Sequence, residues 1–333
     1  MISLKHLKAT DSYRISRYAE HAHYITRQGN PVGYYVEMAG GPGRAPSWWH
    51  GCGADTLGLE GHVQPDHLAR ILAAEGFGRR SHPRRRVATD LTISAPKSVS
   101  IAALALGDDE LLEGMCSAAM AAVDHVERTC VMTRKGKGGR TRSTTGNLIA
   151  ACFLHEDARP VDGIADPQAH IHVLIGNLTQ RPDGGWRAVD LHFGTGNCRW
   201  YRADTIFHQK LAETARSLGY GTVETLHGFE LAGLPREIRE RFSYRRRQVD
   251  AALVERGRTR KQSRAGERIN ACLASRESKT QLSQPEQREE WHRRAVAADL
   301  DLESLRGGRV TRTSLRKTTR LATDRSDWRP LLG

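Results

Sequence analysis

Residues 166–175 read DPQAHIHVLI, and this stretch shows the pattern around which the rest of the sequence is organised. Successive side chains of an extended strand point to opposite faces, so His170 and His172 share one face. The isoleucine and valine residues that alternate with them fill the other face, which indicates a strand packed on a core. The sequence therefore predicts a buried β-strand with two imidazoles roughly 6.5 to 7 Å apart.

A third histidine follows the preceding strand candidate, residues 147–154. If the two strands are antiparallel neighbours, His155 lies beside His170 and His172. Three neutral imidazoles leave coordination positions open, which is typical of a catalytic metal. An isolated His-x-His is also compatible with a half-exposed strand, but the third histidine argues against that interpretation. Imidazole ligands suit Zn²⁺ or Mn²⁺, and Mg²⁺ can bind alongside phosphate oxygens, so we predict only a divalent ion.

Strand and helix patterns surround this stretch. Residues 87–93 alternate like a strand and run through Ser-Ala-Pro into a helix over 99–106. Residues 109–127 carry apolar side chains at helical spacing, which predicts a helix lying on a sheet. The remaining predictions are short helices and loops up to about residue 53, a basic hairpin-like loop over 134–142, a strand pair around 183–185, a helix over 205–218, and a basic helical region beyond 235.

Composition favours a polyanionic partner. The 333 residues include 51 Lys and Arg against 38 Asp and Glu, giving a formal charge of +13, which favours nucleic acid. The six cysteines contain no C-x-x-C pair, which indicates a reducing compartment. No apolar run approaches the roughly 18 residues that cross a bilayer, and the first six residues show no apolar segment of the kind found in signal peptides. We therefore expect a cytoplasmic protein without membrane insertion.

Tyrosines are concentrated at the start of the sequence. Five of the eight lie within the first 35 residues, interleaved with arginine and histidine, which is a poor composition for a core. They are Tyr13, Tyr18, Tyr24, Tyr34 and Tyr35. A tyrosine can attack a phosphodiester when its proton is removed or its phenolate is stabilised, leaving a covalent phosphotyrosine. A phosphate-facing surface therefore fits this region better than aromatic packing.

Several motifs together resemble one family. Residues 90–100, DLTISAPKSVS, closely resemble the segment DLTFSAPKSVS of conjugative relaxases of the TrwC/TraI (MobF) kind. The stretches 145–155 and 166–172 look like the metal-site run of that family, in the same order. Residues 48–59, with their W-x-G-x-G-A and L-G-L patterns, resemble its early segment. The resemblance covers roughly residues 1–300.

This resemblance implies an α+β fold of the histidine-hydrophobic-histidine (HUH) endonuclease superfamily. Its central antiparallel β-sheet is flanked by helices, with a mainly helical C-terminal region that closes over DNA. We expect a relaxase domain over residues 1–305 and a flexible basic tail over 306–333. The sequence contains no G-x-x-x-x-G-K-[ST] phosphate loop, so we expect no helicase domain in it. The chain would then be either a relaxase domain excised from a longer protein or a self-standing relaxase.

Residue roles follow from the same resemblance. His155, His170 and His172 correspond to the metal ligands, and Asp90 to an acidic residue that orients a histidine or accepts the proton of the nucleophile. Tyr18 falls where the first catalytic tyrosine lies, although Ala19 follows it where many relatives have a second tyrosine. The pair Tyr34 and Tyr35 resembles the second tyrosine pair of the family. Tyr24 competes for the second role, and Tyr13, more weakly, for the first.

DNA contacts are predicted at basic positions. They are Lys97, Arg134, Lys135, Lys137 and Arg140, with Arg276 and Lys279 from the C-terminal closing region. The competing interpretation is a solvated charged face. Three tryptophans, Trp48, Trp49 and Trp291, are candidates for stacking on bases, although tryptophan is more common in cores.

Together these features predict a site- and strand-specific DNA nickase and strand transferase. It would cleave single-stranded or hairpin DNA at nic in an origin of transfer, through a 5′-phosphotyrosyl intermediate, with accessory DNA-binding proteins and a type IV secretion coupling protein as partners. Two alternatives stay open. One is a metal-dependent nuclease or replication-initiator-like HUH protein acting on single-stranded DNA, and the other is a catalytically inactive DNA-binding module.

Overall fold

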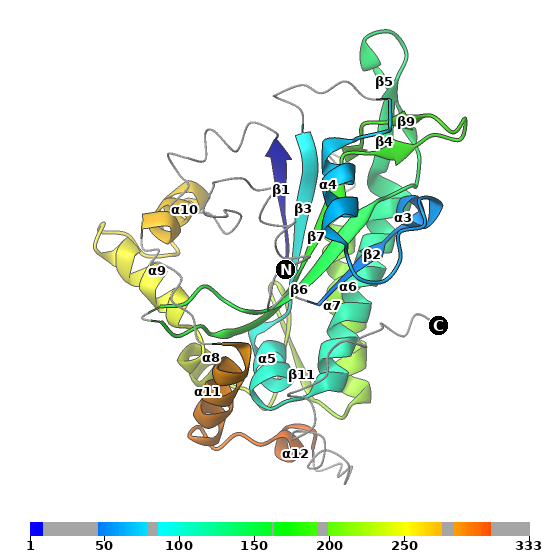
Figure 1. Cartoon of the computed structure of the whole chain (residues 1–333). Coiled ribbons are helices and arrows are strands. Elements are labelled where there is room, and N and C mark those ends of the chain that lie inside the picture. The colour runs from blue at the N-terminus through cyan, green and yellow to red at the C-terminus, as the bar shows by residue number, and fades with distance from the viewer. Residues whose placement is uncertain (9–45, 79–85, 162, 192–198, 275–282, 308–333) are drawn as a thin grey trace. The chain divides into compact units, whose positions relative to one another are not determined.

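The computed structural model describes residues 1–8, 46–78, 86–161, 163–191, 199–274 and 283–307. The chain divides into two compact units, both drawn in Figure 1. The first unit takes residues 1–94, 116–155 and 170–210, and the second takes 95–115, 156–169 and the residues from 211 onward.

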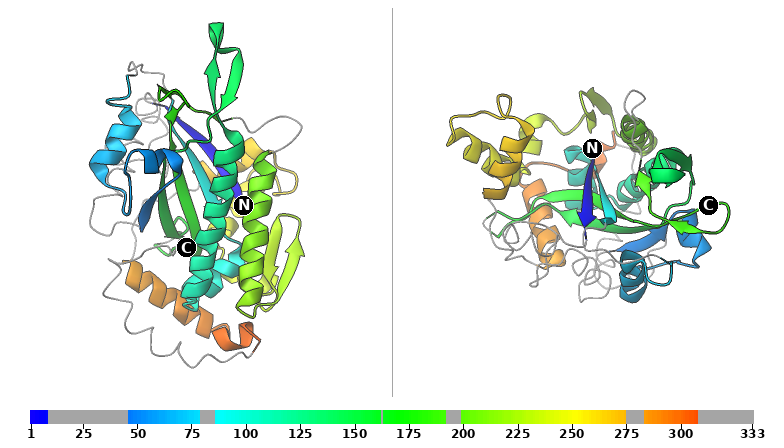
Figure 2. Two further views of the ribbon diagram at one scale, coloured as in Figure 1. Left: turned by 90° about the vertical axis from the view of Figure 1, so that its right-hand side faces the viewer. Right: turned by 90° about the horizontal axis from the view of Figure 1, so that it is seen from above.

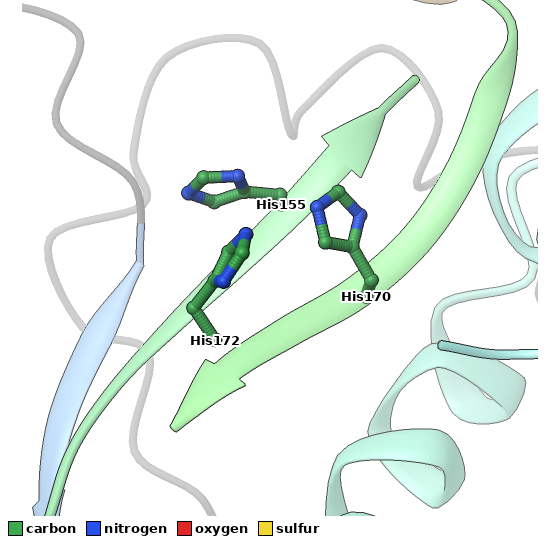
Figure 3. A group of neighbouring side chains, drawn as sticks. All are labelled: His155, His170 and His172. Carbon is green, nitrogen blue, oxygen red and sulfur yellow. The ribbon is translucent and has the colours of Figure 1, made fainter. Parts of the chain in front are cut away.

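A five-stranded sheet forms the centre of the first unit. The strand order is β1 (Ile2–Lys8), β3 (Arg86–Ser94), β7 (Pro167–Gly176), β6 (Ala150–Asp157) and β2 (Ser47–His50). The pairs β1–β3, β3–β7 and β2–β6 are antiparallel, and Figure 3 shows β6 and β7 running in opposite directions. The prediction of an antiparallel sheet in an α+β fold, with two neighbouring histidine-bearing strands, is confirmed.

The two edge strands correct one prediction. The first 53 residues were expected to form short helices and loops, yet β1 and β2 occupy opposite edges of the sheet. Edge strands need only one paired side, so they tolerate short length and polar side chains. In β1 the buried Ile2 and Leu7 alternate irregularly with exposed residues, and a register shift follows Leu7. Because apolar and polar residues do not alternate regularly in β1, its sequence does not show the pattern that predicts a strand.

One face of the sheet carries a hydrophobic core. Here the helices α3 (Cys52–Thr56) and α4 (Pro65–Ala73) contribute apolar side chains to a cluster that includes Trp49, Phe153 and Leu174. The close approach of α4 requires the glycine at the end of β7, because a Cβ at Gly176 would lie 2.7 Å from the Ile71 side chain. This core therefore covers the Gly176 end of β7.

The opposite face packs against long helices. Trp48 donates its indole N–H to the Met120 sulfur at 3.3 Å, which joins β2 to α6 (Asp109–Cys130). Figure 2 shows α6 beside α7 (Arg199–Ser217), and a Cβ at Gly114 would lie 2.4 Å from the side chain of Thr214. The two helices expected at these positions are therefore confirmed, although α6 ends three residues after its predicted end and α7 begins six residues before its predicted start.

Two small hairpins extend from the first unit. Strands β4 (Val131–Lys135) and β5 (Thr141–Thr144) enclose the basic loop, and β4 also pairs with β10 (Asp190–Leu191). Strands β8 (Thr179–Gln180) and β9 (Trp186–Arg187) flank the predicted Asp-Gly-Gly turn. Both hairpins agree with their predictions.

The second unit is mainly helical, and its part beyond Pro235 agrees with the helical C-terminal region that was predicted. It begins with α5 (Lys97–Ser100), which continues into a π-helical turn (Ile101–Ala105), and includes a hairpin of β11 (Thr222–Thr225) and β12 (Gly228–Leu231). Its helices are α8 (Arg236–Arg241), α9 (Tyr244–Val254), α10 (Ala265–Ala274), α11 (Gln284–Val296) and α12 (Leu302–Leu305). No helix in the described part of the chain is long and apolar enough to cross a membrane.

Candidate metal centre

His155, His170 and His172 converge on one face of the sheet, as Figure 3 shows. One ligand atom from each imidazole lies within 4.8 Å of the others. The ring centroids are 4.9 to 5.2 Å apart, and the rings meet edge to face. The predicted grouping of the three histidines is therefore confirmed.

Strand alternation explains this grouping. His172 and Leu174 point to the same face of β7, as do His155 and Phe153 on β6, and both apolar residues belong to the core cluster. Ile171 and Val173 are fully buried on the opposite face, as predicted. Each strand thus uses its apolar end for the core and its polar end for the histidines.

Asp90 fixes the orientation of His172. The register of β3 against β7 pairs Asp90 with Leu174, which brings its carboxylate to 3.0 and 3.2 Å from His172 Nδ1. Asp90 is only 1% exposed, and the hydroxyl of Thr92 lies 3.3 Å from the same nitrogen. A proton held on Nδ1 by the carboxylate leaves Nε2 as the lone-pair atom, which is the common arrangement behind a metal-bound histidine.

The donor set fits a divalent transition-metal ion. Three imidazole nitrogens bound at about 2.1 Å to one tetrahedral ion would lie about 3.4 Å apart, a small contraction from the 4.8 Å limit observed here. His172 is the most buried of the three, at 6% exposed, and His155 and His170 are half-buried. Three protein ligands leave a coordination position for substrate oxygen, as in catalytic metal sites.

The motif at residues 94–100 anchors the chain leading into His170. The amide N–H of Ala169 donates to Ser100 Oγ at 3.1 Å, and the Lys97 ammonium donates to the Pro167 carbonyl at 2.8 Å. The carboxylate of Glu230 accepts from both the amide and the hydroxyl of Ser98. Lys97, Ser98 and Ser100 of this motif therefore each have a structural role, because each side chain satisfies a backbone or carboxylate group.

The early glycine motif positions the chain leading into β6. Gly51 has φ +101°, and a Cβ there would lie 2.6 Å from the Leu148 carbonyl oxygen. Buried Glu127 accepts hydrogen bonds from the amides of Cys52 and Leu148, at 2.9 and 2.7 Å. Burial raises the pKa of this carboxyl, against the hydrogen bonds that lower it. Glu127 therefore joins the two family-like segments, a role that sequence analysis did not predict.

The predicted DNA-binding residues have different surroundings. Lys135, Lys137 and Arg140 are exposed on the β4–β5 hairpin, whereas Arg134 donates to Asp190 at 3.0 Å. Lys97 is half-buried in the second unit, and burial lowers its pKa to about 8. The roles of all five residues in DNA binding stay predictions.

Several predicted residues lie outside the described part of the chain. These are all the candidate nucleophiles, Tyr13, Tyr18, Tyr24, Tyr34 and Tyr35, together with Arg276 and Lys279. Their roles stay predictions.

The three tryptophans are core residues. Trp48 is 5% exposed, Trp49 is 8% exposed and Trp291 is 1% exposed. Their burial leaves no face for stacking on a base, so the alternative interpretation as core holds.

The arrangement defines a class of protein with a three-histidine site on an antiparallel sheet, of the HUH kind. The sequence matches the family model of the TrwC relaxase over residues 18–298, and the chain belongs to this family. It is 32% identical over 288 residues to the multifunctional conjugation protein TraI of Escherichia coli strain K12. The match covers 81% of this chain and 16% of TraI, so the chain spans only a small part of that relative.

Solved structures agree with this family. The conjugative relaxase TrwC in complex with oriT DNA, in a metal-free form, is 29% identical with a TM-score of 0.75. A copper-bound form of that complex is 30% identical with a TM-score of 0.74. A complex of TrwC with a 27-mer DNA comprising the recognition hairpin and the cleavage site is 28% identical with a TM-score of 0.75. Each comparison covers 91% of this chain and 100% of the TrwC chain.

Proposed function

We propose that this chain is a conjugative relaxase that nicks single-stranded DNA at a specific site in an origin of transfer. The observation that carries the proposal is the convergence of His155, His170 and His172 with Asp90 behind His172. The family match and the likeness to TrwC bound to oriT DNA support the same substrate class. We place the reaction in the cytoplasm, with accessory DNA-binding proteins and a type IV secretion coupling protein as partners.

The proposed reaction is a transesterification. The hydroxyl oxygen of a tyrosine attacks the nic phosphorus, and a bond forms between them as the bond to the 3′ oxygen breaks. The phenolic proton is lost, the 3′ oxygen leaves as a hydroxyl, and a 5′-phosphotyrosyl linkage keeps the energy of the phosphodiester. Tyr18 is our proposed nucleophile, with Tyr24, Tyr34 and Tyr35 as candidates for a second transfer. Re-attack by a 3′ hydroxyl would rejoin the strand.

The protein would contribute to this reaction by holding a divalent ion and by fixing the orientation of its histidine ligands. A divalent ion bound by the three histidines would act as a Lewis acid on a nonbridging phosphate oxygen. Asp90 would hold the His172 ring with its Nε2 lone pair available, so that the imidazole need not reorient during the reaction. The contact at 3.0 Å between Asp90 and His172 supports the histidine-orienting role over the proton-accepting role.

Basic surfaces support a DNA substrate in each unit. The β4–β5 hairpin of the first unit exposes Lys135, Lys137 and Arg140. The second unit has a pocket of about 630 Å³ with one carboxylate, Asp166, among five cationic side chains. The cations are Lys97, Arg245, Arg246, Arg260 and Arg268. Neutralising DNA phosphates with such groups would make the affinity fall steeply with salt.

The test is covalent capture of cleaved DNA. The protein would be mixed, with a divalent metal, with 3′-labelled oligonucleotides tiled across both strands of the element that encodes it. We expect one oligonucleotide to yield a labelled adduct that survives a denaturing gel, because the attacked phosphate stays on the tyrosine. Tyr18→Phe should abolish the adduct. Tyr201→Phe is the matched control, since Tyr201 is 66% exposed on α7.

Other outcomes would contradict the proposal. Nicked DNA without an adduct would indicate a hydrolase that uses a metal-bound water as its nucleophile. Binding without nicking, unchanged by His170→Ala and His172→Ala together, would indicate a DNA-binding module. An adduct that survives Tyr18→Phe would keep the proposed reaction and move the nucleophile to another early tyrosine, which peptide mapping would identify.

A further inference from the structure

Two buried carboxylates lie at the ends of the loop that connects the histidine-bearing strands. Glu156 follows His155 directly and is 1% exposed, and Asp166 precedes His170 by four residues and is 2% exposed. A carboxylate is expensive to bury unless a cation pairs with it and hydrogen bonds satisfy its oxygens. Each of these two therefore depends on its partner.

Both partners come from α11. Arg288 donates from Nε and Nη2 to the two oxygens of Glu156, at 2.8 and 2.6 Å, which is the bidentate geometry that only arginine provides. Arg294 donates from Nη2 to Asp166 at 3.1 Å and to the Arg241 carbonyl at 2.6 Å. One helix thus holds both ends of the loop.

Trp291 lies between the two arginines on α11 and forms a third hydrogen bond to the same loop. Its indole N–H donates to the Ala165 carbonyl at 2.7 Å, and its side chain is 1% exposed. Residues 288, 291 and 294 are separated by three positions each, so they lie along one side of the helix. A capping box formed by Ser283 and Glu286 fixes the first turn of α11, and therefore the residue at which the helix begins.

We propose that α11 is a positioning element for the metal centre. Arg288 holds the residue bonded to His155, and Trp291 and Arg294 hold the chain just before His170. The helix thereby sets the separation of β6 and β7 at the point where their imidazoles must share one ion. Metal affinity depends on ligand placement within about 0.5 Å, so a side chain that contacts no ligand can still control it.

The positioning role of α11 rests on the proposed metal site. It predicts that changes in the α11 arginines alter the metal affinity, which a purely structural ion pair would not do. A structural pair would stabilise the fold and leave the metal affinity unchanged. The second unit offers a matched comparison in Asp108, which is 2% exposed and pairs with Arg306 through Nε at 2.9 Å. Asp108 is also a buried carboxylate held by arginine, but it lies far in sequence from every histidine of the site.

The experiment compares Arg288→Lys and Arg294→Lys with Arg306→Lys in the full chain. Lysine keeps the charge and loses the planar fork, so folding is preserved better than with alanine. Binding of Co²⁺ is followed by its visible absorption, and folding by circular dichroism at the same temperature. We expect Arg288→Lys and Arg294→Lys each to weaken Co²⁺ binding by 10-fold or more and to change its absorption bands. Arg306→Lys should leave both unchanged.

The other possible outcomes distinguish failure of the α11 proposal from failure of the proposed metal centre. Unchanged Co²⁺ affinity and spectrum in both α11 variants would reduce α11 to a structural role and overturn the inference. Equal weakening by Arg306→Lys would mean that general stability, and not position, controls the site. Absence of Co²⁺ binding to the unaltered chain would instead contradict the proposed metal centre itself. If Arg288→Lys fails to fold, Arg294→Lys tests the same inference at the other end of the loop.

Discussion

Replacing Asp90 with asparagine should weaken metal binding without unfolding the protein. Asparagine has nearly the same shape, so the buried position stays filled. Its amide can donate to His172 Nδ1, which would favour the tautomer that places a proton on Nε2, the nitrogen that would bind the ion. The carboxylate contact at 3.0 Å would also lose its charge. Loss of such a partner behind a ligand typically costs about 10- to 100-fold in metal affinity, or about 1.4 to 2.7 kcal/mol.

The assay is a calorimetric titration of the metal-free protein with Zn²⁺ or Co²⁺. The matched control is Asp124→Asn, because Asp124 contacts His50 Nε2 at 2.7 Å in the same unit, outside the three-histidine group. We expect Asp124→Asn to bind the ion with unchanged affinity. Unaltered affinity in Asp90→Asn, or an equal loss in both variants, would refute the orienting role of Asp90.

Three further predictions concern stability, each measured by urea denaturation. Arg306→Gln should lower the free energy of unfolding by about 3 to 5 kcal/mol, because it leaves Asp108 buried without its cation. Burial lowers the pKa of Lys97 to about 8 from 10.5, so the unfolded chain binds more protons between these values. Relative to Lys97→Met, the stability of the unaltered protein should therefore rise by up to about 3 kcal/mol from pH 8 to 10.5. Gly51→Ala should cost more than about 2 kcal/mol, because it combines φ +101° with a clash against a backbone oxygen. Gly58→Ala, at φ +64° in open space, should cost only about 1 kcal/mol.

The central strand and the metal ligands could be predicted because their pattern is local. Alternation along residues 170–175 sets both the histidine face and the buried face, whatever the rest of the chain does. The apolar spacing of α6 is local in the same sense. Placing His155 beside the pair needed one more assumption, that two adjacent strands are neighbours in an antiparallel sheet, and this holds for most short connections.

The residues that hold these strands in place could not be predicted in the same way. Arg288 is 132 positions from Glu156 in the sequence, and α11 reads as a polar, solvent-facing helix. The three arginines of α11 are balanced by three glutamates, and two of them, Arg288 and Arg294, pair with buried carboxylates. Only the tertiary structure shows which cations are already paired. The same holds for Glu127, whose role depends on the amides of two distant segments.

The polarity of β7 explains why such side chains are needed at all. Its Gly176 end is fixed by apolar packing beneath α4, where burial of hydrocarbon supplies the stabilisation. Its His170 end faces the site, and the histidines there cannot be covered by a core if they are to bind an ion and a phosphate. That end must be fixed by directional contacts instead. Ser100 binds the Ala169 amide, and Lys97 binds the Pro167 carbonyl. A strand that is both core and ligand platform therefore requires two kinds of anchor, and the 94–100 motif supplies the second kind.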